Sequence, residues 1–126
     1  MYRRRQTMIR LSDSEWKIAT YLWDNGSMTI TELTKVLSSE TGWQKNTVIT
    51  LLKRMEEKNA VSHNQDSRAK SFYMQIDRTE AEIEETESFL DKVYSGNVGL
   101  MISNLVRSDK LSKDDIEELL KILEER

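Results

Sequence analysis

The fold is decided by residues 29–58, which read TITELTKVLSSETGWQKNTVITLLKRMEEK. Thr29 and Glu32 match a capping box, in which each side chain satisfies a free backbone donor of a first helical turn. A helix is therefore predicted to begin there and to end before the break at 40–42. A second helix is predicted over about 44–58. Two helices joined by so short a turn are typical of a helix-turn-helix motif.

The second helix of this motif has one apolar and one polar side. Its apolar positions have the spacing i, i+3, i+4, i+7 of a helix packed on a core. They are Val48, Leu51, Leu52 and Met55. At about 100° per residue, the opposite side is centred on Asn46, Thr50 and Lys53 and flanked by Thr47, Ile49 and Arg54. That side is small, polar and cationic, and it is either a binding face or an ordinary solvated helix face.

The flanking segments complete a winged helix-turn-helix. Upstream, Ser12 with Glu15 forms another capping box and predicts a helix that ends before Gly26. Downstream, two short alternating runs over 60–64 and 71–76 predict a β-hairpin. The three tryptophans have helical spacing beside other apolar residues, so we expect them in the core. They are Trp16, Trp23 and Trp43.

The remainder of the chain carries three further amphipathic segments. Thr79 with Glu82 predicts the start of a helix, a shorter apolar segment follows over 98–106, and Ser112 with Asp115 predicts the last helix. Each segment has an apolar stripe along one side, and chains of roughly 50 residues rarely bury such stripes without a disulfide, a bound metal or a partner chain. We therefore predict a homodimer in which the stripes pack across a two-fold axis. The expected interface residues are Ile83, Leu90, Tyr94, Met101, Leu105, Ile116, Leu119, Leu120 and Leu123.

The charge is divided between these two parts. Residues 1–76 hold 12 Lys/Arg and 8 Asp/Glu, and the rest of the chain holds 7 and 14. The formal net charge of -3 therefore combines a part of +4 with a part of -7. A positive part with an exposed polar helix face suits a polyanionic partner, whereas the acidic helices would be repelled by phosphates.

The polar helix face suits the major groove of DNA, where base edges are read by short hydrogen-bonding or methyl-bearing side chains. We expect base contacts from Asn46, Thr47, Thr50 and Lys53, and phosphate contacts from Lys45, Arg54, Arg68 and Lys70. The alternative for Arg68 and Lys70 is an ordinary charged hairpin tip. The run Arg3-Arg4-Arg5 is either an arm on the DNA backbone or a terminus without a role.

The sequence thus predicts a mainly α protein with a small β-hairpin wing. A winged-helix DNA-binding domain is expected over 1–77, and a three-helix dimerisation domain over 78–126.

Composition excludes several other classes. The chain has no cysteine and one histidine, His63, so disulfides, thiolate metal sites and Ser-His catalysis are not expected. His63 is expected to be a strand residue that faces polar neighbours. No segment resembles a membrane span or a signal peptide, which predicts a cytoplasmic protein. The carboxylates do not converge with a nucleophile, so we expect neither an enzyme nor a cofactor or metal site.

The sequence resembles the penicillinase-repressor family of BlaI/MecI type over nearly the whole chain after Met8. The N-terminal half matches at Ser12-Asp13-Ser14-Glu15-Trp16, Leu22-Trp23, Trp43, Thr47-Val48-Ile49-Thr50-Leu51-Leu52-Lys53-Arg54 and Lys58. The C-terminal half matches at Tyr94-Ser95-Gly96, Asn104-Leu105-Val106 and Leu111-Ser112-Lys113-Asp114-Asp115-Ile116-Glu117-Glu118-Leu119. The spacing of the tryptophans and of the Thr-x-x-Thr-Leu motif is the more specific part of this match.

The resemblance implies a dimeric repressor of a β-lactam-resistance or similar antibiotic-response operon, bound to an inverted-repeat operator. In the resistance branch a membrane-bound metalloprotease sensor leads to cleavage of the repressor at an Asn-Phe bond, which corresponds here to Asn104-Leu105. Leucine replaces phenylalanine at that bond, and Gln44-Lys45-Asn46-Thr47 stands where the family commonly has Ser-Pro-Lys-Thr. The copper-responsive branch has a cysteine-rich tail, which this chain lacks.

Two alternatives remain open from the sequence. One is a cysteine-free relative of the copper-responsive repressors that answers another signal. The other is a winged helix without DNA binding that docks a protein partner through its acidic helices.

Overall fold

The computed structural model describes residues 9–65 and 68–126. The chain divides into two compact units, Met1–Glu82 and Ile83–Arg126. In the described part of the chain, no helix combines the length and the apolar character needed to cross a membrane.

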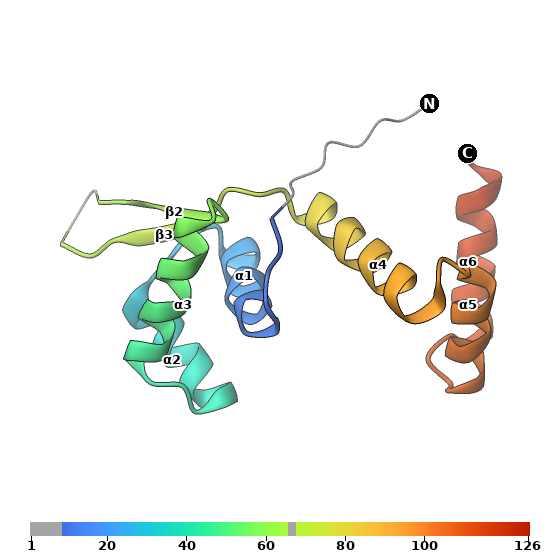
Figure 1. The fold of residues 1–126 in the computed structure, drawn as a ribbon, viewed down its shortest axis with the longest axis horizontal. Helices are drawn as coiled ribbons and strands as arrows, with labels where there is room; N and C mark the ends of the chain where they lie inside the picture. Colours follow the sequence, from blue (N-terminus) through green and yellow to red (C-terminus); the bar gives the residue numbers. More distant parts are fainter. Residues whose placement is uncertain (1–8, 66–67) are drawn as a thin grey trace. The chain divides into compact units, whose positions relative to one another are not determined.

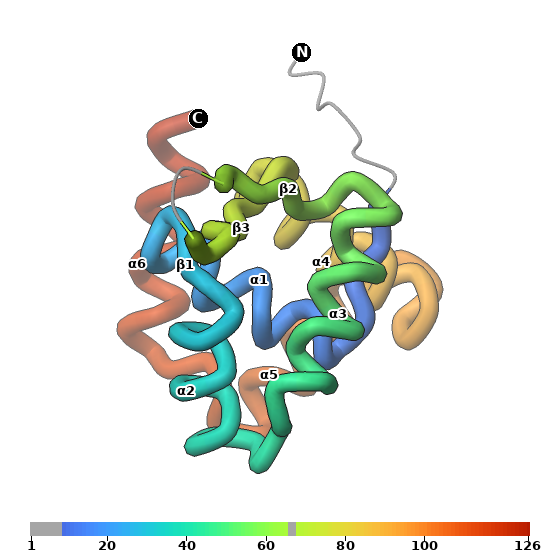
Figure 2. Tube along the Cα trace, turned by 90° about the vertical axis from the view of Figure 1, so that its left-hand side faces the viewer, coloured from blue at the N-terminus to red at the C-terminus, as the bar shows by residue number. Residues whose placement is uncertain are grey.

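The first unit is a winged helix-turn-helix, as predicted. In chain order it contains α1 (Asp13–Asn25), β1 (Met28–Thr29), α2 (Ile30–Thr41), α3 (Lys45–Glu57), β2 (Val61–Asn64) and β3 (Ser71–Met74). The first turn of α4 (Arg78–Tyr94) completes it. The β2–β3 hairpin projects beyond α3 as the wing (Figure 1). Figure 2 shows α2 and α3 side by side.

The ends of the helices follow the capping signals in the sequence. The side chains of Ser12 and Thr29 each accept a hydrogen bond from the backbone N–H of the glutamate three residues later, and the carboxylate of that glutamate accepts one from the backbone N–H of the cap residue. Gly42 ends α2 in the left-handed region with φ +78°, where a side chain would be strained. The short turn that separates the two motif helices therefore depends on this glycine.

The sheet contains one more strand than the sequence predicted. Its order is β1–β3–β2 and both pairings are antiparallel, so the hairpin is joined by the two-residue strand Met28–Thr29. Met28 pairs with Phe72 and is itself buried. A strand of two residues carries no detectable alternation, and it forms only because β3 lies beside it.

One hydrophobic core holds the first unit together. The tryptophans lie at its edge as partly buried side chains, and the indole of Trp23 donates to the Ile76 carbonyl at 3.2 Å. Burying this much apolar surface is the main favourable term for folding. The buried apolar residues of the core are Leu11, Ile18, Ala19, Leu22, Met28, Leu33, Leu37, Val48, Leu51, Leu52, Met55, Ala60, Val61, Phe72, Ile76 and Ala81.

The start of α4 differs from the prediction. The helix begins at Arg78, and the carboxylate of Asp77 accepts a hydrogen bond from the Glu80 backbone at 3.0 Å, so Asp77 does the capping that was expected of Thr79. Two contacts fix this first turn on the first unit: Ala81 is 6% exposed, and Arg78 donates to Asp24 at 2.7 Å. For this reason the division between the units falls inside α4, rather than before it.

The second unit consists of the rest of α4, α5 (Val98–Arg107) and α6 (Lys113–Glu124). Asn97 caps α5, and Ser112 with Asp115 forms the predicted capping box of α6. Tyr94 accepts a hydrogen bond from the Asn104 side chain at 3.3 Å. All of residues 83–126 are described, and none of their side chains is buried. The unit is therefore well formed locally but lacks a core of its own.

Candidate nucleic-acid interface

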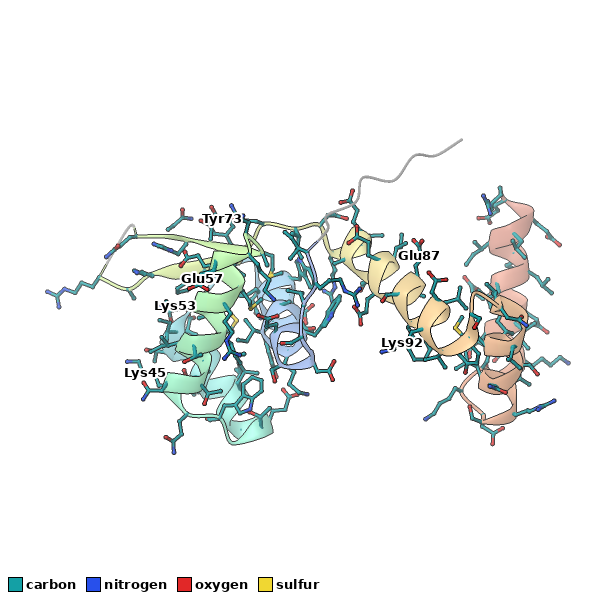
Figure 3. All side chains as sticks on the ribbon, in the orientation of Figure 1. Lys45, Lys53, Glu57, Tyr73, Glu87 and Lys92 are labelled. Atoms are coloured by element: carbon teal, nitrogen blue, oxygen red, sulfur yellow. The ribbon has the colours of Figure 1, made fainter. Side chains whose placement is uncertain are left out.

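Helix α3 turns its apolar side into the core and its polar side to solvent. The apolar positions Val48, Leu51, Leu52 and Met55 are between 0% and 7% exposed. All eight residues predicted to contact DNA are exposed: Lys45, Asn46, Thr47, Thr50, Lys53 and Arg54 on α3, and Arg68 and Lys70 on the wing. In Figure 3, Lys45 and Lys53 project from the side of α3 that faces away from α1.

The N-terminus of α3 lacks the side-chain cap found at other described helices. Its cap residue Gln44 makes no such hydrogen bond. By contrast α1, α2, α5 and α6 are capped by Ser12, Thr29, Asn97 and Ser112. Because the first backbone N–H groups of a helix have no partner within it and attract anions, this end suits a phosphate. Lys45, the first residue of α3, adds a full positive charge there.

One side chain in the centre of the exposed face is held in a fixed position. The Thr50 hydroxyl donates to the Asn46 carbonyl at 2.9 Å. This uses the hydroxyl proton and fixes the side-chain rotamer. Thr50 therefore offers an incoming base edge its oxygen as an acceptor, together with its methyl group.

The wing is linked to α3 by a side-chain contact that was not predicted. His63 on β2 is hydrogen-bonded through Nδ1 to the carboxylate of Glu56 on α3. The imidazole also lies against the ring of Phe72, with centroids 5.5 Å apart. His63 thus faces a polar neighbour from its strand, as expected. The identity of that neighbour depends on the packing of β2 on α3, which the sequence does not specify.

A buried carboxylate of α1 forms an ion pair with the residue that follows α3. Glu15 on α1 is 2% exposed, and its Oε1 lies 2.8 Å from the ammonium of Lys58, which follows α3. Lys58 also donates to the Arg10 carbonyl at 2.9 Å. Burial alone would raise the pKa of Glu15, but hydrogen bonds from Lys58 and Ser12, with the charge of Lys58, outweigh it and lower that pKa. Sequence reasoning recognised Glu15 only as a capping residue.

The residues predicted for dimerisation lie in the second unit and are accessible. Leu90, Tyr94 and Met101 are half-buried. The others, Ile83, Leu105, Ile116, Leu119, Leu120 and Leu123, are between 36% and 61% exposed.

The bond between Asn104 and Leu105 lies within helix α5. The carbonyl of Asn104 accepts a backbone hydrogen bond from Ser108 at 3.0 Å, and its side chain donates to Tyr94. Both residues of the bond are exposed.

Two further expectations concern the N-terminus and metal binding. Arg3, Arg4 and Arg5 lie outside the described residues. Over residues 9–65 and 68–126, no three His, Cys, Asp or Glu side chains form a group suited to a metal ion.

The chain is similar in sequence to known repressor proteins over nearly its whole length. A model of the family described as "Penicillinase repressor" matches residues 11–125. The chain is 32% identical to the penicillinase repressor of Bacillus licheniformis over 116 residues, which cover 92% of this chain and 91% of that protein. It is 24% identical to the methicillin resistance regulatory protein MecI of Staphylococcus aureus strain N315, with 92% and 94% covered.

A solved structure of a DNA complex is also similar. Monomeric BlaI of Bacillus licheniformis in complex with the blaP half-operator matches with a TM-score of 0.55 and 26% identity. The match covers 60% of this chain and 93% of that chain.

Proposed function

This chain belongs to the penicillinase repressor family, and from that premise we propose that it is a homodimeric transcriptional repressor that binds an inverted-repeat operator. The genes under its control would be those of a β-lactam-resistance or similar antibiotic response, since the similar proteins are penicillinase and methicillin-resistance regulators.

The observation that carries the DNA-binding part is the exposed side of α3. It presents small polar and cationic side chains from a helix that begins without a side-chain cap. A helix of this kind fits the major groove, where Asn46, Thr47, Thr50 and Lys53 would be nearest the bases. Lys45 and Arg54 would contact phosphates beside the groove, and the wing would bring Arg68 and Lys70 to the backbone.

DNA binding is tested by titrating the full chain with labelled duplexes at two salt concentrations. We expect affinity to fall steeply as salt rises, because each neutralised phosphate releases counterions. Lys92→Ala, which changes an exposed lysine of α4 outside the winged helix, should bind with the affinity and salt dependence of the unmodified chain. An affinity that is absent or independent of salt contradicts the proposal and favours the rival, a winged helix that docks a protein partner.

The lack of buried side chains in the second unit supports the proposed dimer. A unit of this size with no buried side chain has too little apolar burial to offset the entropy of ordering its backbone. A second copy supplies the missing surface, and isologous packing of the α4, α5 and α6 stripes is the simplest closed arrangement. A dimer also gains operator affinity: once one winged helix has bound its half-site, the second is held at high effective concentration near the other half-site.

We propose that derepression proceeds by cleavage of the Asn104-Leu105 bond, in a pathway that starts at a membrane-bound sensor metalloprotease. Cleavage there removes residues 105–126, which include all of α6. The hydrogen bond from Ser108 to the Asn104 carbonyl must open first, so the rate should follow local unfolding of α5. Without α6 the dimer interface loses one of its three stripes, and the monomers bind DNA weakly.

Cleavage is tested by incubating the full chain with lysate from host cells treated with a β-lactam. A fragment that ends at Asn104 is expected by mass spectrometry. Asn104→Ala should block its formation. Asn97→Ser, which changes another exposed asparagine followed by an aliphatic residue but keeps a capping side chain at the start of α5, should not. An intact chain in derepressed cells contradicts this mechanism and favours a relative that answers another signal.

A further inference from the structure

Ile49 is the one exposed large apolar side chain in the first unit, over its described residues 9–65 and 68–82. It is 37% exposed and lies within α3. The core beneath α3 is supplied by other residues of the helix, which are almost completely buried. Single exposed aliphatic residues are common on protein surfaces, so the position of Ile49 matters more than its exposure.

Ile49 lies on the side of α3 that would enter the groove. At about 100° per residue, it is one turn from Lys45 and one turn from Lys53, and Asn46 is its neighbour at i−3. Helical side chains lean toward the N-terminus of their helix, so Ile49 covers the surface between Lys45 and Asn46. An apolar side chain thus stands between two cations and beside an amide.

This arrangement constrains what Ile49 can recognise. With Lys45 on a phosphate and both Asn46 and Lys53 at the bases, Ile49 lies among the groove-facing residues and faces base edges rather than solvent. A branched aliphatic side chain has no hydrogen-bonding group, and among the four bases only thymine presents a methyl group in the major groove. Burying Ile49 against a polar base edge would leave a donor or acceptor unsatisfied, so the side chain also disfavours other bases.

We propose that Ile49 is a specificity-determining residue that packs on the C5-methyl group of one thymine in each operator half-site. This inference rests on the proposed function and adds a reading role to a residue outside the expected set of hydrogen-bonding contacts. Thr50 is fixed by its bond to Asn46 and presents its own methyl one residue further on, so the two contacts must be separated experimentally.

The experiment combines removal of the methyl group with removal of the side chain. A duplex selected by the full chain from a random library is prepared with each thymine in turn replaced by deoxyuridine, which differs only by that methyl. Affinities are measured for the unmodified chain, Ile49→Ala, Ile49→Val and the control Thr50→Ser. Ile49 is outside the core, and thermal unfolding of Ile49→Ala checks that the fold is kept.

We expect the unmodified chain to lose about four-fold in affinity at one thymine of a half-site, the effect of one buried methyl. Ile49→Ala removes the contact from both half-sites of a dimer, so it should bind the thymine duplex about sixteen-fold more weakly than the unmodified chain. It should show no further loss with deoxyuridine at that position. Ile49→Val and Thr50→Ser should keep the sensitivity there.

Two results overturn the inference. One is equal affinity of the unmodified chain for thymine and deoxyuridine at every position. The other is full methyl sensitivity retained by Ile49→Ala. Both would leave the proposed function standing, whereas failure to select any duplex overturns that function, and this inference falls with it.

Discussion

The carboxylate of Glu15 and the ammonium of Lys58 form an ion pair, 2.8 Å long, between the first turn of α1 and the residue that follows α3. Glu32 has the same place in the capping box of α2, but it is exposed. The two glutamates make equivalent capping contacts, and the buried pair with Lys58 distinguishes them. Helix α3 is therefore fixed at its C-terminal end by a residue of α1.

Glu15→Gln should lower the free energy of unfolding by about 1–2 kcal/mol, because the amide still accepts from Ser12 but loses the charge-assisted bond to Lys58. Chemical denaturation followed by circular dichroism measures it. Glu32→Gln is the matched control and should cost clearly less. Equal losses in the two variants would mean that Lys58 adds nothing to capping.

Stability should also fall in acid. Hydrogen bonds and the charge of Lys58 hold the pKa of Glu15 below its ordinary value despite burial, so its ionised form favours the folded state. This contribution is complete above the unfolded pKa of about 4.3 and is lost as pH falls through the lower folded pKa. Thermal unfolding between about pH 6 and pH 3 should show a steeper decline for the unmodified chain than for Glu15→Gln. Parallel curves would contradict the assignment.

Base contacts and phosphate contacts should respond differently to alanine. Asn46→Ala should reduce discrimination at one base pair by about 1–3 kcal/mol, the usual contribution of a bidentate pair. Lys70→Ala should weaken all duplexes alike and reduce the slope of log affinity against log salt by about one. Competition titrations with single-base variants measure both effects. Uniform weakening by both variants would refute the division of roles.

The contact between His63 and Glu56 should affect how firmly the wing is held on α3. His63→Ala removes it, so the wing must be ordered when DNA binds, and affinity should fall by up to about five-fold, since partly exposed pairs contribute about 0.2–1 kcal/mol. Base preference should not change, because the exposed side of α3 is untouched. Fluorescence anisotropy with matched and mismatched duplexes checks this. A changed preference would mean that the wing reads sequence.

Removing one apolar side chain of α6 should weaken self-association. Leu119→Ala deletes a side chain twice in a symmetric dimer, so the dissociation constant should rise roughly a hundredfold, given about 1.5 kcal/mol for each buried leucine. Sedimentation velocity over a concentration series measures it. Glu118→Gln, at an exposed neighbouring position of α6, should leave association unchanged. A monomer in the unmodified chain would refute the dimer.

The sequence predicted most of the first unit because its signals are local. Capping boxes at Ser12 and Thr29 and the apolar spacing of α3 depend on residues within two turns of one another. The strand Met28–Thr29 was missed because it exists only through pairing with β3. The cap of α4 was misplaced because Asp77 and Thr79 are both suitable, and contacts of Arg78 and Ala81 with the first unit decide between them.

For the candidate site, the sequence identified which residues of α3 would be exposed, because helical periodicity alone determines that. It did not identify the Glu15–Lys58 pair or the His63–Glu56 contact. These join residues from different elements, so they depend on tertiary packing that a one-dimensional pattern does not contain.

The absence of any buried side chain in residues 83–126 has a consequence for the number of chains in the cell. If this unit gains its core only from a second copy, its folding is a second-order process. At low abundance the concentration of folded dimer then rises with the square of the monomer concentration, and the folded fraction rises in proportion to that concentration. Unpaired chains would expose apolar helices to cellular proteases, so dilution at cell division would remove the folded dimer faster than in proportion to its copy number.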